Sequence, residues 1–264
     1  MLTLVARSLR RIAPLTGGVA AILSAFQFAL VAVAAAYERA GSFGQLGALV
    51  PDFAQGHLGA ALASFASMTT TGYFEPAVVM LIAQFAIHLG AEPAADVETG
   101  IADIVLAHPL PRAWIVTRTL IVVAVVTAAL VATMGTSTWL GLRWLAPPAA
   151  PWPQAGVVLQ LMLNLTAVAW CFAAATLAAS GWARRRAQAQ APLAVAAIAA
   201  YLVWFLAGWW TPIRPLARLS PFQYFSGAAI LRGAGRTLFN VSVLGAATAV
   251  ASAIAYWRFE RRDM

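Results

Sequence analysis

Six long apolar runs constrain the fold of this chain more than any other feature. Their expected bounds are about 17–37, 73–89, 114–142, 155–182, 191–210 and 238–257. A membrane-crossing helix needs roughly 20 mainly apolar residues. Only 10% of the residues are charged, whereas a soluble domain has about 25%. The sequence therefore predicts an all-α, polytopic membrane protein: a single transmembrane domain over residues 1–264 with six transmembrane helices.

The first 12 residues predict a separate amphipathic helix. At 100° per residue, four apolar side chains share one face: Leu2, Val5, Leu9 and Ile12. Three basic side chains lie opposite: Arg7, Arg10 and Arg11. This pattern is typical of a helix that lies on a membrane surface. A cleaved signal peptide is the alternative, because AVAAAYE resembles a small-residue cleavage site, but this apolar run is long for a signal peptide and further runs follow.

The basic residues predict the orientation of the chain and exclude some functions. All 17 are arginine, so the chain has no lysine for a P-loop or a Schiff base. With six spans, eleven arginines fall on the side of the two termini and six on the other. The positive-inside rule then places both termini in the cytoplasm, in a cell inner membrane. Arginines that flank apolar runs indicate topology rather than nucleic-acid binding, so nucleic acid is not an expected partner.

The stretch DVETGIADIVLAHPLPRAWIVTR, residues 96–118, interrupts the apolar pattern between the second and third runs. Projected as a helix that starts at Asp96, it puts Asp96, Thr99 and Asp103 on one face, and His108-Pro109 ends it. One interpretation is a connector that rests on the lipid surface. The other is a docking helix for a cytoplasmic partner, which the acids favour because an anionic leaflet repels them.

Three motifs resemble those of ABC-2 type transporter permeases. The segment from Glu98-Thr-Gly100 to Pro109-Leu-Pro-Arg112 is similar to the coupling-helix signature of that family. LSPFQYF, residues 219–225, is similar to its external segment before the sixth span, and WRFERRD, residues 257–263, resembles its C-terminal motif. The order of the spans matches the family over the whole chain.

The resemblance implies that this chain is the membrane subunit of an ATP-driven exporter and not itself an enzyme. Two ABC ATPase subunits would bind from the cytoplasm, and a second permease copy would complete a homodimer or heterodimer. The chain itself would hold no cofactor, since ATP and Mg²⁺ would bind the ATPase, and the substrate would be hydrophobic or amphipathic. The positions that map onto the coupling contact are Asp96, Glu98, Gly100, Asp103, Leu106, Pro109 and Arg112.

The resemblance assigns two further elements. The N-terminal helix with its three arginines would correspond to the elbow helix of the family. The segment between the fifth and sixth spans would form external gate helices. The candidate gate residues are Pro221, Phe222, Tyr224 and Phe225.

Several polar residues fall in or near the apolar runs, where polar groups are costly and usually face a bundle interior or a cavity. The candidates for a translocation pathway are Gln27, Glu75, Gln84 and Asn164. Hydrogen bonds between helices are the alternative role for the amides. For Glu75 the alternative is a cap at a helix start, because Pro76 follows it. The histidines are too dispersed for a metal site, and no motif predicts catalytic residues.

Two other functions are compatible with six spans. An ion-coupled secondary transporter would favour broken helices at the midplane and an internal repeat. A subunit of an ABC-type assembly or maturation complex would use the same ATPase contact without exporting a substrate.

Overall fold

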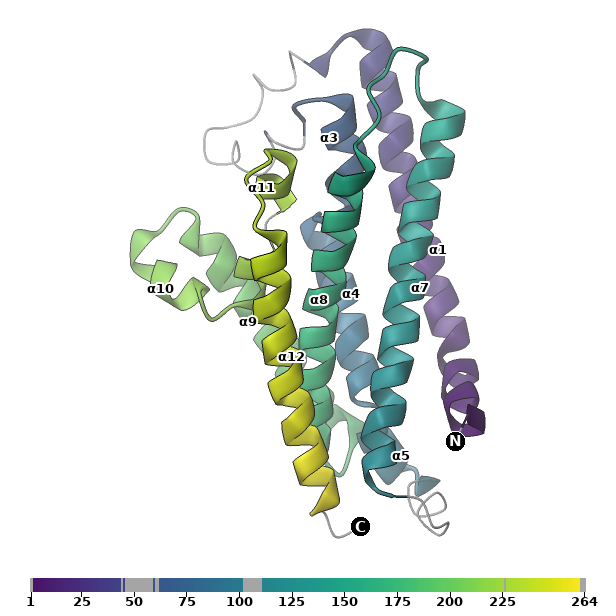
Figure 1. The fold of residues 1–264 in the computed structure, drawn as a ribbon, viewed down its shortest axis with the longest axis vertical. Coiled ribbons are helices and arrows are strands. Elements are labelled where there is room, and N and C mark those ends of the chain that lie inside the picture. Colours follow the sequence, from purple (N-terminus) through teal and green to yellow (C-terminus); the bar gives the residue numbers. More distant parts are fainter. Residues whose placement is uncertain are drawn as a thin grey trace.

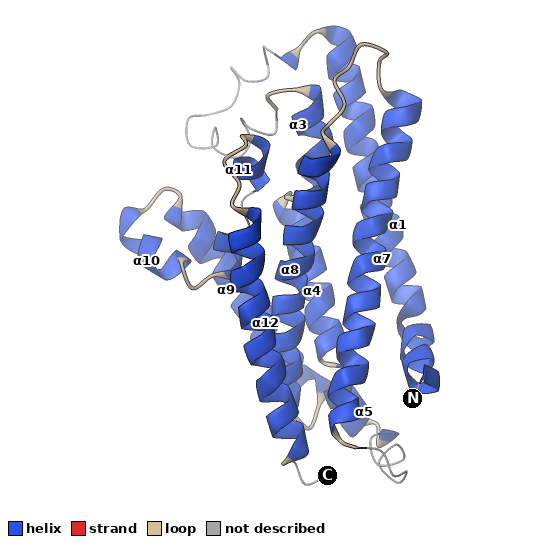
Figure 2. Ribbon diagram, in the orientation of Figure 1, coloured by secondary structure: helices blue, strands red, loops and turns tan. Residues whose placement is uncertain are grey.

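The computed structural model describes residues 2–43, 45, 59, 62–101, 111–225 and 227–261. Over these residues the regular structure is entirely helical (Figure 2). The longer helices are α1 (Leu2–Ala40), α4 (Pro76–Gly90), α7 (Ala113–Leu145), α8 (Ala155–Ser180), α9 (Arg186–Ala207) and α12 (Thr237–Glu260). The shorter ones are α3 (Phe65–Thr70), η3 (Thr71–Tyr73), α5 (Glu92–Glu98), η4 (Thr211–Ile213), α10 (Arg214–Ala217), η5 (Pro221–Tyr224) and α11 (Gly227–Leu231).

Six helical segments of the described chain are long and apolar enough to cross a membrane, as the sequence predicts. They are Thr3–Ala40, Phe65–Gly90, Ala113–Leu145, Ala155–Ser180, Arg186–Ala207 and Thr237–Glu260. Each contains most of the corresponding predicted run. Their outward faces are rich in large apolar side chains, such as Ile22, Leu163 and Val195, which fits a multi-pass membrane protein.

The prediction of a separate N-terminal elbow helix is wrong, because this segment belongs to the first long helix. α1 is continuous from Leu2 to Ala40 and keeps Pro14 inside it, so at 1.5 Å per residue it is about 58 Å long. The predicted amphipathic pattern is present, because Val5 and Ile12 are buried and Arg7 is exposed. The apolar face, however, packs into the main core of the protein. Side-chain contacts with the bundle therefore hold this segment in line with the span.

The second span is broken near its middle. α3 passes into the short 3-10 helix η3, the helix stops at Phe74, and Glu75 has an extended backbone with ψ 128°. Pro76 then starts α4 at a position where its missing N–H costs nothing. The break packs closely against α1, because a side chain at Gly72 would collide with the amide of Gln27.

The helices form one elongated bundle with both chain termini at the same end (Figure 1). α5 lies at that end, which we call the terminal end. The main core joins α1, α4, α7 and α8, with large buried side chains such as Leu23, Ile82, Leu130 and Leu165. The segment from η4 to η5, which we call the outer segment (residues 211–225), projects sideways at a lower level in Figure 1 than the upper ends of α1 and α7.

Candidate functional site

The short helix α5 starts directly after the second span, because the chain turns at Gly90 and Ala91. A side chain at Gly90 would collide with the carbonyl oxygen of Ala173, so glycine permits the close approach of α4 to α8. Ser180 of α8 also donates a hydrogen bond of 3.1 Å to the Gly90 carbonyl. Pro93 lies in the first turn of α5 and favours a helix start there. The end of the second span is thus fixed on α8, and this fixes where α5 begins.

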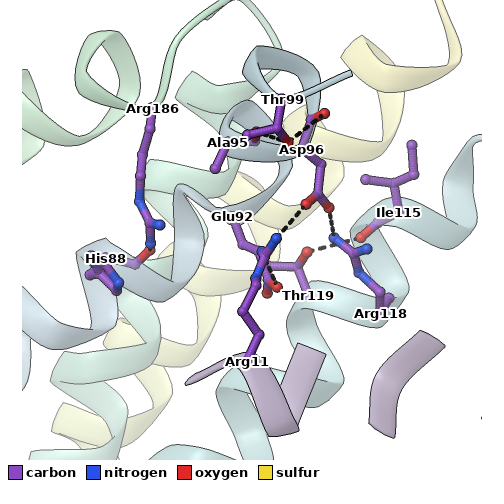
Figure 3. Close-up of polar contacts among 10 residues, drawn as sticks. All are labelled: Arg11, His88, Glu92, Ala95, Asp96, Thr99, Ile115, Arg118, Thr119 and Arg186. Carbon is purple, nitrogen blue, oxygen red and sulfur yellow. Dashed lines mark hydrogen bonds and ion pairs between the residues drawn. The ribbon is translucent and has the colours of Figure 1, made fainter. Parts of the chain in front are cut away.

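Two acids of α5 form ion pairs with arginines of two spans (Figure 3). Glu92 and Asp96 are four residues apart and therefore lie on one face of the helix. Arg11 of α1 contacts Glu92 at 2.6 Å and Asp96 at 3.0 Å. Arg118 of α7 contacts the other oxygen of Asp96 at 2.6 Å. We call these four residues the junction, because they join α1, α5 and α7.

The junction is charge-balanced and mostly buried. The side chains of Glu92, Asp96 and Arg118 are only 2%, 6% and 7% exposed, whereas that of Arg11 is 40% exposed. Burying charges is expensive, so such a pair adds little net stability, but removing one partner strands the other at a cost of about 3–5 kcal/mol. The junction therefore fixes the relative position of three helices more than it stabilises the fold.

The far end of α5 is attached to a fourth helix. The carboxylate of Glu98 accepts a hydrogen bond of 2.8 Å from the backbone N–H of Arg186, the first residue of α9. A negative group at a helix N-terminus is favourable, because the first N–H groups of a helix lack backbone partners. The guanidinium of Arg186 in turn donates to the carbonyl of His88 in α4, also at 2.8 Å. A displacement of α5 would thus act on α1, α7 and α9 together.

The structure differs from the predicted coupling helix in where the helix begins and ends. A continuous helix starting at Asp96 is wrong: α5 ends at Glu98, and Gly100 has a φ of 69°, a left-handed conformation that favours glycine. Asp96 faces the junction, whereas Glu98 is exposed. Arg112 directly precedes α7. Three predicted coupling residues lie outside the described residues: Asp103, Leu106 and Pro109.

The three predicted elbow arginines have different surroundings. Arg11 enters the junction, while Arg7 and Arg10 are exposed on the same turns of α1. The sequence pattern puts the three arginines on one helix face, but in the structure only Arg11 forms ion pairs with α5.

The candidate pathway residues are not brought together in one site. Gln27 is fully buried and donates to the carbonyl of Thr69 beside the break in the second span. Gln84 donates to Ala194 of α9, and Asn164 donates to Gln160 within its own helix. Glu75 is half-buried at the start of α4. The hydrogen bonds of Gln27 and Gln84 to carbonyls of other helices match the alternative role given to them, whereas the bond of Asn164 stays within α8.

Two of the candidate gate residues are deeply buried aromatic side chains. Phe222 is 2% exposed, and its ring centroid lies 5.3 Å from that of Phe172 in α8 and 5.6 Å from that of Tyr201 in α9. Phe225 is 5% exposed. Tyr224 is partly exposed and donates to the Arg218 carbonyl. The outer segment is therefore held by aromatic packing, and its described residues form no ion pair.

Sequence reasoning missed Glu92, Arg118 and Arg186 as members of this site. Glu92 could have been found from the sequence. It is four residues from Asp96, a spacing that puts both acids on one helix face, and Pro93 beside it is typical of a helix start. The partners Arg11 and Arg118 were not, because local patterns do not say which spans are neighbours.

Among the described residues, no group of three His, Cys, Asp or Glu side chains is close enough to hold a metal ion. Comparisons with models of known protein families, with characterised proteins and with solved structures find no match to this chain.

Proposed function

We propose that this chain is the membrane subunit of an ATP-driven ABC exporter in a cell inner membrane, with both termini in the cytoplasm. ABC ATPase subunits would dock on α5 and the residues that follow it, and a second permease copy would complete the complex. ATP and Mg²⁺ would bind the ATPase chains, and a hydrophobic or amphipathic substrate would move outward.

The observation that carries this proposal is the attachment of α5. A helix of seven residues after the second span is joined by ion pairs to α1 and α7 and by a hydrogen bond to α9. A push on so short a helix reaches three spans without deforming long loops. The six spans, the absence of lysine and the three motifs support the same function.

The docking contact can be tested by co-purification. The full chain is purified from its native membrane, and the co-purifying chains are identified by mass spectrometry. We expect an ATP-binding subunit with the wild type and its loss with Asp103→Arg plus Leu106→Ala, which reverses a charge and removes an apolar contact.

The matched control is Arg218→Asp plus Leu219→Ala, which makes the same kinds of change in the outer segment. It should retain the ATPase subunit. The proposal is wrong if no ATP-binding chain co-purifies with the wild type, or if the Asp103 and Leu106 variant retains it as well as the control does.

One observation favours a second candidate, an ion-coupled secondary transporter. The second span is broken at Thr71–Glu75, and transporters of this class bind substrates and ions at broken helices. Transport by the purified chain in liposomes, driven by an ion gradient without ATP, would support this candidate and contradict the first.

A further inference from the structure

Two tryptophan–arginine pairs lie side by side where α8 and α12 end. The guanidinium carbon of Arg258 lies 5.4 Å from the centroid of the Trp182 ring. The guanidinium carbon of Arg261 lies 4.8 Å from the centroid of the Trp257 ring. Both rings remain about half exposed, at 55% and 48%. We call these four residues the tryptophan–arginine patch.

The local sequence explains why the pairs form. α8 ends at Ser180 with Gly181 at its C-cap, and a side chain at Gly181 would collide with the stem of Arg258, so glycine lets α12 approach. Trp257 and Arg261 are four residues apart, and Arg258 and Arg261 are three apart, spacings that place side chains on one face of a helix. The patch is therefore built from helix ends and contains no long loop.

The positive charge of the patch is not neutralised by the described part of the chain. Arg184 and Arg185 are exposed in the turn that follows Trp182 and add to the charge. None of the ion pairs between described residues involves the four arginines near this turn. Glu260 is two residues from Arg258 and next to Arg261, and neither spacing brings side chains to the same face of a helix.

The geometry of the pairs suits an oxyanion. A cation–π contact holds a guanidinium over an indole face without using its N–H donors, and arginine matches phosphate oxygens with two parallel hydrogen bonds. The Nε–H of Arg258 is buried without an acceptor among the described residues, so it does not reach a bound ligand. The groups left to donate are the terminal N–H groups of Arg258 and the guanidinium of Arg261, an exposed residue.

The surroundings select a lipid rather than a free anion. Tryptophan at the end of an apolar span is typical of the membrane interface. Ile254 lies one turn before Arg258 and is 41% exposed, so an acyl chain can lie along α12 on the side of the patch toward the middle of the bundle. We infer that the tryptophan–arginine patch binds the phosphate of an anionic phospholipid at the terminal end of the bundle.

Lipid retention by the purified full chain tests this inference. The chain in nonionic detergent is mixed with phosphatidylglycerol or phosphatidylcholine of identical acyl chains, and bound lipids are counted by native mass spectrometry. We expect the wild type to prefer phosphatidylglycerol by roughly tenfold, a factor that one good charge-assisted hydrogen bond supplies. Arg258→Gln plus Arg261→Gln should reduce this preference severalfold.

The matched control removes the same charge at the same end. Arg7→Gln plus Arg10→Gln changes two exposed arginines of α1 that have no tryptophan partner, and it should keep the preference. Equal losses in the two double variants would show that total charge alone matters and would overturn the inference. Displacement of phosphatidylglycerol by millimolar inorganic phosphate would also overturn it, in favour of a small-anion site.

A second double variant keeps the inference testable if the glutamine variant does not fold. Arg258→Lys plus Arg261→Lys keeps the charge but loses the planar, stacked donor. We expect partial loss of the preference for phosphatidylglycerol. A lysine variant with the full wild-type preference contradicts the geometric account.

Discussion

The terminal end of the bundle and the outer segment hold their helices in different ways. At the terminal end, Asp96 is clamped between Arg11 and Arg118 at 3.0 and 2.6 Å. In the outer segment, Phe222 packs against the rings of Phe172 and Tyr201 with no ion pair among the described residues there. Ion pairs need one geometry, because a stranded charge is costly. Aromatic contacts accept several tilts and offsets.

This difference matches the direction of work in the proposed function. In that proposal the terminal end should transmit a push without yielding, which ion pairs among three helices favour. The outer segment should be able to slide, and rings in tilted and edge-to-face contacts allow that. Three substitutions should separate the two kinds of attachment by their effects on the free energy of unfolding.

The largest effect is expected in the outer segment. Phe222→Ala should lower the free energy of unfolding by about 3–5 kcal/mol, because it leaves a cavity where the ring is fully enclosed. Thermal unfolding in detergent micelles, followed by circular dichroism, measures this change. Leu219→Ala is the control: Leu219 is 82% exposed, so its loss should cost no more than about 0.5 kcal/mol. Similar effects of the two variants would mean that packing does not hold this segment.

Loss of the buried arginine of the junction should be nearly as severe. Arg118→Met should cost about 3 kcal/mol, the lower end of the range for breaking a buried pair, because Asp96 keeps Arg11. Adding Asp96→Asn should recover part of the loss, since the stranded charge is then gone. A double-mutant cycle on unfolding free energies measures this coupling. Simple additivity of the two changes would contradict the junction.

Loss of the exposed arginine of the junction should have the smallest effect. Arg11→Gln should cost about 2 kcal/mol, because it strands the buried Glu92, but Arg11 itself is 40% exposed and water screens part of the pair. In 1 M salt this cost should shrink, while that of Arg118→Met should persist. A salt-independent cost for Arg11→Gln would show that both arms of the junction are equally buried.

The sequence predicts the six spans well, because backbone polar groups inside a bilayer must be paired within the helix, so the length of an apolar run identifies a span. The sequence misplaces the start of the first span. Pro14 and the pair Gly17-Gly18 favour an interruption by local propensity, yet α1 continues through them because Val5 and Ile12 pack into the core. Tertiary contacts override local propensity there.

The candidate site is predicted less completely. The acids of residues 96–103 correctly indicate a site at the end of the second span. The partners of Asp96 could not be predicted, because Arg118 is 22 positions and Arg11 is 85 positions away in the sequence. Such contacts depend on which spans are neighbours. The helix start at Pro76 agrees with the alternative given for Glu75, a cap before a proline, but the helical turns of α3 and η3 on the other side of the break were not predicted as part of this span.

A labelling experiment tests whether ATP binding by the ATPase changes the outer segment through α5. In a Cys171→Ser background, which removes the single cysteine, Gln223→Cys places a thiol on the exposed face of η5. Its reaction with a membrane-impermeant maleimide is followed in the complex with and without ATP.

We predict that ATP changes the labelling rate by roughly fivefold or more, the lower range of ordinary coupling between sites. Asp96→Asn should remove this response while the ATPase subunit stays bound. If the Asp96→Asn complex responds to ATP as fully as the unsubstituted one, the junction does not transmit work and the account is wrong.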